Sequence, residues 1–233
     1  MKKILRNHFR NVIYSDEDWH ILFEKRNIAK KLLLMFDKEG LNPIIHGSVA
    51  RGDTHEGSDI DLVFTNIIPS FQIEYILHKN GFNNYFREII MATPRDPIKL
   101  YIYLSELETI TVPLTKLEQN NLEFYNFGGK IRLDQLIKNV RVSGINKKLV
   151  LIKPTLHGHE EISIIDNEAL VAKEVGISIK TINERKKILL KREKYGRTGV
   201  FLKRKLQINE TTEEVLKRLA NLKSIVRKKL YKK

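Results

Sequence analysis

The stretch that decides the fold reads HGSVARGDTHEGSDIDLVF and covers residues 46–64. Gly47 and Ser48 stand at the end of one apolar run, and two acids, Asp59 and Asp61, interrupt the next. Side chains two residues apart on a strand share a face, which puts these carboxylates about 6.6 Å apart along the chain. The stretch therefore predicts a strand, a glycine-serine corner and a second strand that carries two neighbouring acids.

The chemistry of these residues suggests a ligand before any family is considered. Two adjacent carboxylates repel each other, and an oxygen-rich pair of this kind suits Mg²⁺ or Mn²⁺. Gly47 and Ser48 offer backbone N–H groups, a hydroxyl and a positive helix end to phosphate oxygens. Alone, either motif is common in solvated loops or capping turns. Their joint spacing instead favours a nucleoside triphosphate beside a divalent cation, as nucleotidyl transfer requires.

A family resemblance follows from the same residues. Gly-Ser-Val-Ala-Arg-Gly and then Ser-Asp-Ile-Asp-Leu resemble the signature of the DNA polymerase beta-like nucleotidyltransferase superfamily, particularly its minimal nucleotidyltransferase branch. The likeness of element order extends to about residue 115. It implies a mixed-sheet palm, a triphosphate bound through Gly47 and Ser48, and Mg²⁺ held by Asp59 and Asp61. It also implies transfer of a nucleoside monophosphate to an acceptor hydroxyl, with release of pyrophosphate.

The sequence departs from this family at the third metal-binding carboxylate. Superfamily members usually carry that acid on a later strand, and the matching strand here, 109–114, has Thr111 where an acid is expected. The nearest acids are Glu106 and Glu108, with Glu88 on an earlier strand. We therefore keep Glu108 as a candidate ligand. The alternative is a catalytically weak or inactive DNA-binding regulator with a nucleotidyltransferase fold.

Two basic residues near the motif have two interpretations each. Arg51 is a phosphate-binding or turn residue, or else a surface cation beside Asp53. Lys99 is a triphosphate ligand on the strand 98–104, or else an exposed strand residue.

The flanking sequence predicts alternating helices and strands. Ser15 followed by Asp18 indicates a helix start, and Gly40 indicates its end. We expect strands at 43–46, 60–64, 85–91, 98–104, 109–114 and 148–153, helices at 71–79 and near 133–140, and a polar loop at 154–161. His157, His159, Glu160 and Glu161 in that loop form either a hinge or a metal cluster. The single Trp19 and the lone His46 are expected to pack in the core.

The composition excludes several classes of protein. The chain has 233 residues, 42% of them hydrophobic, and no Cys. It can therefore bury sizeable cores, but it cannot form disulfides, thiolate zinc sites or a cysteine nucleophile. Because no apolar run reaches the length of a membrane span, we expect a cytoplasmic protein.

The charge distribution predicts two modules. Residues 166–233 hold 20 Lys and Arg against 8 Asp and Glu, whereas residues 1–165 are nearly balanced at 22 against 20. We expect a nucleotidyltransferase-like domain over 1–160 and a basic domain over 161–233. A concentrated positive charge indicates a nucleic-acid partner.

The basic segment resembles winged helix-turn-helix proteins over some twenty residues. Ala172, Gly176 and Ile182 have the spacing of the two helices and their turn, and residues 194–205 would form the wing. The predicted fold class is therefore α+β, a mixed-sheet palm followed by a small, mostly helical domain. The alternative for this segment is a packing domain with a solvated lysine-rich face. The candidate nucleic-acid contacts are Lys180, Thr181, Lys186, Lys187, Arg197, Lys203 and Arg204.

Overall fold

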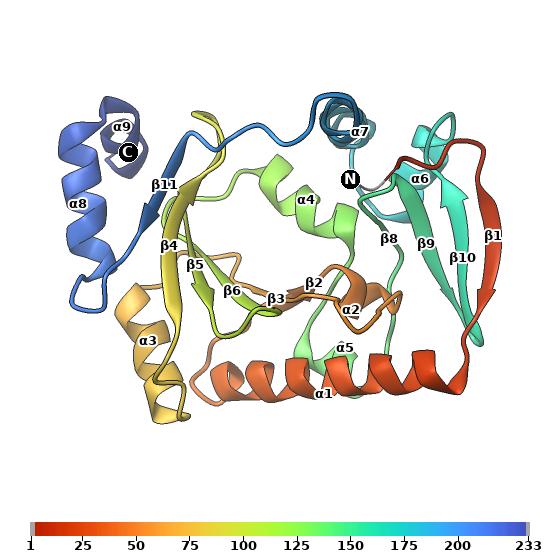
Figure 1. Ribbon diagram of the computed structural model, residues 1–233, viewed down its shortest axis with the longest axis horizontal. Coiled ribbons are helices and arrows are strands. Elements are labelled where there is room, and N and C mark those ends of the chain that lie inside the picture. The colour runs from red at the N-terminus through yellow and green to blue at the C-terminus, as the bar shows by residue number, and fades with distance from the viewer. Residues whose placement is uncertain (1–2, 232–233) are drawn as a thin grey trace.

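The computed structural model describes residues 3–231 and contains two β-sheets (Figure 1). The larger sheet has seven strands in the order β11-β4-β5-β6-β3-β2-β7. Strands β3 and β6 are parallel and the other neighbours are antiparallel, so the sheet is mixed, as predicted. In sequence order its strands are β2 (Ile44–His46), β3 (Ile60–Val63), β4 (Phe86–Met91), β5 (Lys99–Tyr103), β6 (Glu108–Pro113), β7 (Lys130–Ile131) and β11 (Leu202–Lys205).

Helices cover one face of this sheet almost completely. The apolar side chains of α1 (Asp16–Asp37), α3 (Ser70–Lys79), α8 (Thr212–Leu222) and α9 (Ser224–Leu230) share one core with that face. We call it the core face. The capping box predicted for Ser15 and Asp18 is present at the start of α1, where the two residues exchange backbone and side-chain hydrogen bonds. This box fixes the entry of the longest helix that packs below the sheet (Figure 1).

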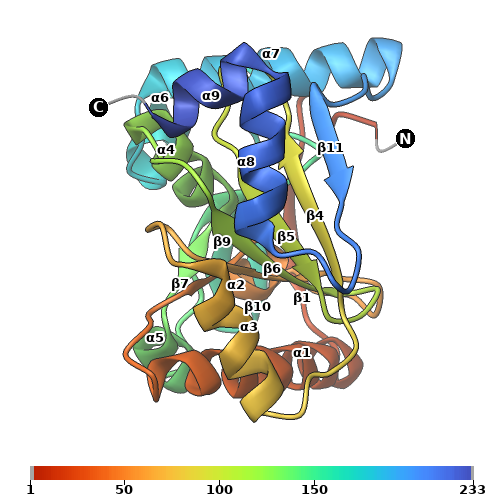
Figure 2. The ribbon, with the colours of Figure 1, turned by 90° about the vertical axis from the view of Figure 1, so that its left-hand side faces the viewer.

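The opposite face is covered only in part. Helix α4 (Gln119–Gly128) packs over its β2–β3 end, where Ile44 and Val63 join Tyr125 in a small apolar cluster. Helix α7 (Ile179–Tyr195) lies beyond α4, at the top of the view in Figures 1 and 2. We call this second face the site face, because the register places Asp61 on it.

Strand register defines the composition of the two faces. Ile60, Leu62, Leu100, Ile102 and Ile110 point into the core and are fully or almost fully buried. Their neighbours in sequence point the other way, and Asp61, Thr109 and Tyr103 occupy paired positions across three adjacent strands. The period of two thus separates an apolar face from a polar face on the same strands.

A four-stranded antiparallel sheet forms the second part of the fold. It has the order β1-β10-β9-β8, with β1 (Phe9–Ile13), β8 (Gly144–Ile145), β9 (Val150–Thr155) and β10 (Gly158–Ser163). Its core includes apolar residues of α6 (Glu168–Glu174) and α7. The loop predicted for 154–161 was wrong, because these residues form the turn and the two flanking strands of a β-hairpin. His159 is buried there and does not lie in a hinge.

The C-terminal segment contributes to both cores. Helices α6 and α7 pack with the four-stranded sheet, whereas β11 pairs with the edge strand β4, and α8 and α9 complete the core of the larger sheet (Figure 2). The predicted boundary at residues 160–161 falls inside β10. The basic strand expected as a wing is present as β11, and it extends the seven-stranded sheet.

Candidate functional site

The glycine-serine corner connects β2 to the short helix α2 (Ser48–Arg51). Gly47 has a φ of 91° and a ψ of −144°, a conformation that side chains with a Cβ rarely adopt. A Cβ placed on Gly47 would lie 4.0 Å from Oδ2 of Asp61. The antiparallel pairing of His46 with Asp61 produces this proximity, because it aligns the end of β2 with the middle of β3.

The two aspartates influence each other, as their spacing predicts. Burial and the charge of Asp59 together raise the pKa of Asp61 to about 6, with Lys147 acting in the opposite direction. Asp59 is half-exposed, and its Oδ2 lies 4.0 Å from Nζ of Lys147. The two acids share a face, and the one lysine near them does not balance both charges. A divalent cation would neutralise the remaining negative charge.

The predicted third acid does not join this pair. Glu108 is aligned with Ile60, so its side chain leaves the sheet on the face opposite Asp61. Thr109 is the residue aligned with Asp61, and Thr111 is aligned with Val63. Within residues 3–231, no group of three or more His, Cys, Asp and Glu side chains is arranged to hold a metal ion.

Glu88 is buried on the site face, but it lies three strands away from Asp61. It accepts a hydrogen bond from the Tyr103 hydroxyl at 3.4 Å and pairs with Nζ of Lys203 at 3.2 Å. Because β5 and β6 separate β4 from β3, Glu88 contributes a distant negative charge to the site face rather than a ligand beside the aspartates.

Arg51 lies behind the corner rather than in front of it. It is buried, donates a hydrogen bond to the Gly128 carbonyl, and pairs with Asp53 at 2.9 Å. These partners join α2 to the end of α4. Arg51 is therefore placed to fix the corner, whereas a ligand approaching Gly47 would meet Asp61.

An aromatic and cationic cluster borders the corner on its other side. The ring of His46 lies 5.3 Å from those of Phe124 and Tyr125, and burial, with the charges of Arg51 and Lys99, lowers the pKa of His46 to about 3. Lys99 donates a hydrogen bond from Nζ to the Tyr125 hydroxyl at 2.9 Å. The sequence placed Lys99 on this strand but gave no sign of its partner, because α4 was not predicted.

The seven candidate nucleic-acid contacts fall into two groups. Lys180, Lys187 and Arg197 are exposed. The other four have partners within the protein: Thr181 with Glu123, Lys186 with Glu168, Lys203 with Glu88, and Arg204 with Glu210. Helix α7 thus presents some of its basic residues to solvent and uses others to hold the fold.

The histidines and acids of β10 form a separate network. Nδ1 of His159 lies 2.8 Å from the Tyr14 hydroxyl, and Glu161 lies 2.6 Å from Nε2 of His8. Tyr14 also donates to the carbonyl of Gly52, at the end of α2. These contacts join the two sheets behind the corner.

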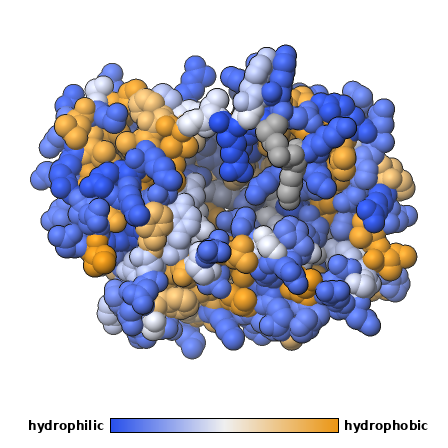
Figure 3. All heavy atoms as spheres, in the orientation of Figure 1, coloured by the Kyte–Doolittle hydropathy of each residue, from blue (hydrophilic) through white to orange (hydrophobic). Residues whose placement is uncertain are grey.

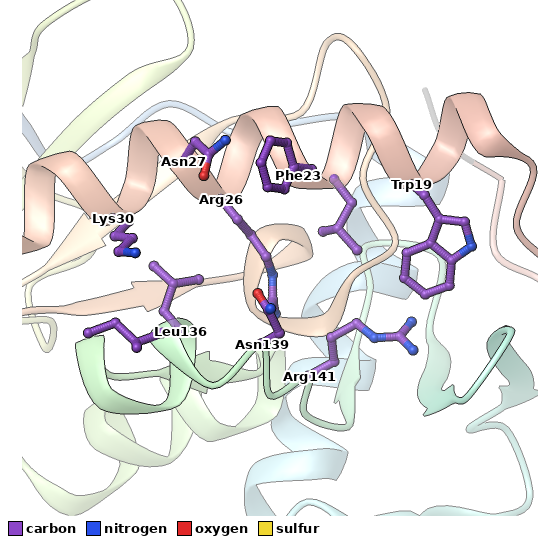
Figure 4. Close-up of a pocket in the computed structure, with 10 residues that line it drawn as sticks. Trp19, Phe23, Arg26, Asn27, Lys30, Leu136, Asn139 and Arg141 are labelled. Carbon is purple, nitrogen blue, oxygen red and sulfur yellow. The ribbon is translucent and has the colours of Figure 1, made fainter.

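A pocket of about 470 Å³ lies between α1 and α5 (Leu133–Ile137) (Figure 4). Arg26 reaches from it to the carbonyls of Val49 and Ala50, and Arg141 lies 4.9 Å from the Trp19 ring. None of the predicted site residues lines this pocket. On the face shown in Figure 3, the space-filling surface is hollowed near its centre, with hydrophilic residues around the hollow.

Comparison with known proteins identifies one family. The model of the nucleotidyltransferase domain matches residues 25–194, which include the corner, both aspartates, α4 and all of α7 except its last residue. Comparison with the curated proteins and with the solved structures finds no match. Within residues 3–231, no helix is both long enough and apolar enough to cross a membrane.

Proposed function

Because the chain belongs to the nucleotidyltransferase domain family, we propose that it is a metal-dependent enzyme that moves a nucleoside monophosphate from a nucleoside triphosphate to an acceptor hydroxyl. The observation that supports this most directly is how close the Gly47 corner lies to Asp61. A Cβ built on Gly47 would lie 4.0 Å from Oδ2 of Asp61. A phosphate at the corner and a cation at the aspartates would therefore be neighbours.

The donor atoms beside the corner fit a hard divalent cation. Asp59 and Asp61 supply carboxylate oxygens, which Mg²⁺ and Mn²⁺ prefer, and the half-exposed Asp59 leaves room for water and substrate oxygens. When bound, the cation neutralises charge on the triphosphate and on the pyrophosphate that leaves. The proposed metal ligands are Asp59 and Asp61 alone.

The residues of the corner would bind and orient the triphosphate. Gly47 lacks a Cβ and lets a phosphate approach the backbone, while Ser48 opens α2 with its hydroxyl and amide. Arg51 and His46 support the corner from behind and beside it. In the reaction, the acceptor oxygen bonds to the α-phosphorus, the bond from that phosphorus to the β-phosphate oxygen breaks and pyrophosphate leaves, and the proton of the acceptor hydroxyl passes to solvent water.

We favour a nucleic-acid acceptor over a protein or a small molecule. The net charge is +14, and exposed lysines and arginines of α7 and the following loop lie on the same chain as the site. Contacts of this kind attract phosphates without reading much sequence. The proposed contacts are the exposed Lys180, Lys187 and Arg197.

The test is transfer of label from each α-labelled nucleoside triphosphate to RNA, DNA and protein acceptors, with Mg²⁺ or Mn²⁺. We expect transfer by the full-length chain and a loss of at least about 1,000-fold in Asp59→Asn/Asp61→Asn, because both metal ligands lose their charge. Glu108→Gln serves as the matched control, since Glu108 lies on the other face, and it should retain activity.

A second function is favoured by the threonines beside the aspartates. Thr109 and Thr111 stand on the strand next to Asp61, where an acid would complete the metal site. A two-carboxylate site could bind nucleotide without transferring it, in a protein that regulates through nucleic-acid binding. Absence of transfer with every nucleotide and acceptor, together with duplex binding by the full-length chain, would support this function instead.

A further inference from the structure

The pocket between α1 and α5 contains none of the residues proposed for the nucleotide site, and much of its lining is apolar. Leu22 and Leu136 in this lining are buried, whereas Phe23 and Ile137 are exposed. The volume of about 470 Å³ lies within the range of small-molecule pockets, roughly 300–1,000 Å³. A cavity of this size can enclose a small molecule, whereas a stable interface with another protein needs a much larger contact area.

The charged side chains that line the pocket are all basic. Arg26 and Lys30 belong to α1, and Arg141 follows α5. Figure 4 shows Arg26 and Lys30 pointing from the helix toward the segment that contains Leu136. Within residues 3–231, no acid lines this pocket and none of the three cations forms an ion pair. An anionic group on a ligand would complement this charge.

Arg26 is the most deeply placed of these cations. It is buried, and burial and the charge of Arg141 together lower its pKa to about 10. Its Nε and Nη2 donate hydrogen bonds to the carbonyls of Val49, Ala50 and Val140. An arginine has five N–H donors, and in the described part of the chain Nη1 of Arg26 has no acceptor. A guanidinium with unused donors and no counter-charge favours an anionic partner.

The third cation forms a rigid wall with an aromatic ring. The guanidinium of Arg141 lies 4.9 Å from the centre of the Trp19 ring, and both residues line the pocket. Arg141 also donates hydrogen bonds to the carbonyls of Thr155 and Gly158, which belong to β9 and β10. The hairpin therefore holds this wall in place. A pre-formed wall is typical of ligand sites, because little order has to be gained on binding.

We propose that this pocket is a regulatory site for a small amphipathic anion, whose apolar body packs against Phe23 and whose anionic group binds Arg26 and Lys30. The apolar lining suits an aromatic or aliphatic body, and the three cations select against neutral and cationic molecules of the same shape.

The contacts of Arg26 connect the pocket to the corner. Val49 and Ala50, whose carbonyls accept its hydrogen bonds, lie in α2, the helix that Ser48 begins. An anion bound to Arg26 would cancel positive charge directly behind this helix and should therefore weaken the binding of a triphosphate at Gly47. This effect on the corner rests on the proposed function, but binding of the anion in the pocket does not.

The first experiment is a fluorescence titration of the full-length protein with anilinonaphthalene sulfonate, an aromatic anion. We expect saturable binding. The uncharged N-phenylnaphthylamine, which lacks the sulfonate, should bind at least about 10-fold more weakly, because it cannot form charged hydrogen bonds. Equal affinity for the two probes would overturn the assignment of an anion.

Matched variants test whether the probe lies in this pocket. Phe23→Ser and Lys30→Glu should each weaken binding of the sulfonate by about 10-fold or more, since one removes apolar contact and the other reverses a charge. Both side chains are exposed, so the fold should be retained, and thermal unfolding checks this. Phe71→Ser and Lys31→Glu change exposed residues outside the pocket and should bind as the wild type does.

Two results of these titrations would overturn the site. One is unchanged binding in Phe23→Ser and Lys30→Glu. The other is absence of binding by a chain that sediments as a dimer and becomes monomeric in Phe23→Ser, which would make the pocket an interface between copies.

The second experiment repeats the label-transfer assay with saturating anilinonaphthalene sulfonate. Transfer by the wild type should fall by about 5-fold or more, a common size for coupling between two sites. Transfer by Phe23→Ser should not change, because its pocket stays empty. Equal inhibition of both proteins would place the probe at the nucleotide site and overturn the regulatory role, as would no inhibition of either.

The outcomes also separate this proposal from the proposed function. Asp59→Asn/Asp61→Asn should bind the sulfonate as the wild type does, because neither aspartate lines the pocket. If transfer occurs but the probe ignores Phe23 and Lys30, the pocket site is wrong and the enzyme stands. If no transfer is found but both variants lose the probe, the anion site stands without the enzyme.

Discussion

The two faces of the seven-stranded sheet use the same strands for opposite purposes. On the core face, Leu62 and Ile110 are fully buried among the side chains of α1 and α3. On the site face, their sequence neighbours are polar: Asp61 is aligned with Thr109, and Thr111 is aligned with Tyr101. The core face gains free energy from burial, whereas the site face holds like charges together and loses some of it.

The site face contains two such like-charge pairs. Asp59 and Asp61 repel each other at the corner, and Lys99 and Arg185 repel each other beside α4. A bound divalent cation would relieve the repulsion between the two aspartates. Burial on the core face therefore offsets the loss of folding free energy that the charges of the site face cause. Single substitutions on adjacent residues can test this.

The largest effect is expected from the core face. Leu62→Ala should lower the free energy of unfolding by about 2–5 kcal/mol, because it removes buried methyl groups and leaves a cavity in a packed core. Urea titration measures this loss. Ile110→Val, a smaller truncation on the same face, should cost about 0.5–1.5 kcal/mol. Losses below about 1 kcal/mol for Leu62→Ala would mean that this face is not the main source of stability.

Much of the large sheet was predictable, because its signals are local. The strands around Asp61 and the helix start at Ser15 depend on alternation and capping within a few residues. The family match and the mixed sheet confirm the predicted fold class. Strand β9 was predicted at 148–153, but β10 was assigned to a polar loop. Strand β1 was missed because it pairs across a long sequence distance, as Arg10 does with Glu161.

In the C-terminal segment too, the sequence predicts an element but not the strand with which it pairs. The basic strand at 202–205 was recognised as a strand, but the sequence does not state which edge it joins, and it pairs with β4. The last helical stretch is divided into α8 and α9, because the chain leaves the helical conformation at Lys223. Pairing partners depend on tertiary packing, which single-residue patterns do not record.

The candidate site was predictable where its residues are close in sequence. Gly47, Asp59 and Asp61 lie within fifteen residues, and their juxtaposition follows from one strand pairing. The position of Arg185 could not be found in this way, because it contacts Phe124 only through the packing of α7 on α4. The alternation of Lys99, Tyr101 and Tyr103 was the available signal that this strand has a polar face.

Substitution of Asp61, the neighbour of Leu62, should change the free energy of unfolding in the opposite direction. Asp61→Asn in EDTA at pH 7 should raise the free energy of unfolding by about 1–2 kcal/mol, because it removes a partly buried charge and its repulsion with Asp59. The folded-state pKa of Asp61 is about 6 against an ordinary value of 3.8, so the wild type loses stability as pH rises through that interval.

The advantage of Asp61→Asn should therefore shrink as the pH falls through about 6 and disappear below the ordinary pKa of 3.8, where the carboxyl is protonated in both states. Urea titrations at about pH 3 and at pH 7 measure the difference. Asp59→Asn is the control, and its effect should be smaller because that side chain is half-exposed. A destabilised Asp61→Asn at pH 7 would show that the carboxylate is favourably bound within the protein and that the site face carries no strain there.

The smallest effect is expected from substitution of Lys99. The change in the free energy of unfolding should depend on pH in the opposite direction to that of Asp61→Asn. Lys99→Met should raise the free energy of unfolding by about 1 kcal/mol at pH 7, less than the burial alone suggests, because the variant also loses the hydrogen bond to Tyr125. The folded-state pKa of Lys99 is about 8 and its ordinary value is 10.5. Between these values the unfolded chain binds more protons, so the wild type gains stability as pH rises.

The advantage of Lys99→Met should accordingly be full below pH 8 and should shrink as pH rises through about 8 towards 10. Lys191→Met, which removes an exposed charge, should show no such trend relative to the wild type. Thermal or urea unfolding of the three proteins between pH 7 and pH 10 measures it. A constant difference across that range would mean that Lys99 is not held against Arg185 at a cost, and the symmetry between the acidic pair and the basic pair would be lost. A shrinking difference would show that the charge of Lys99 lowers the stability of the folded protein.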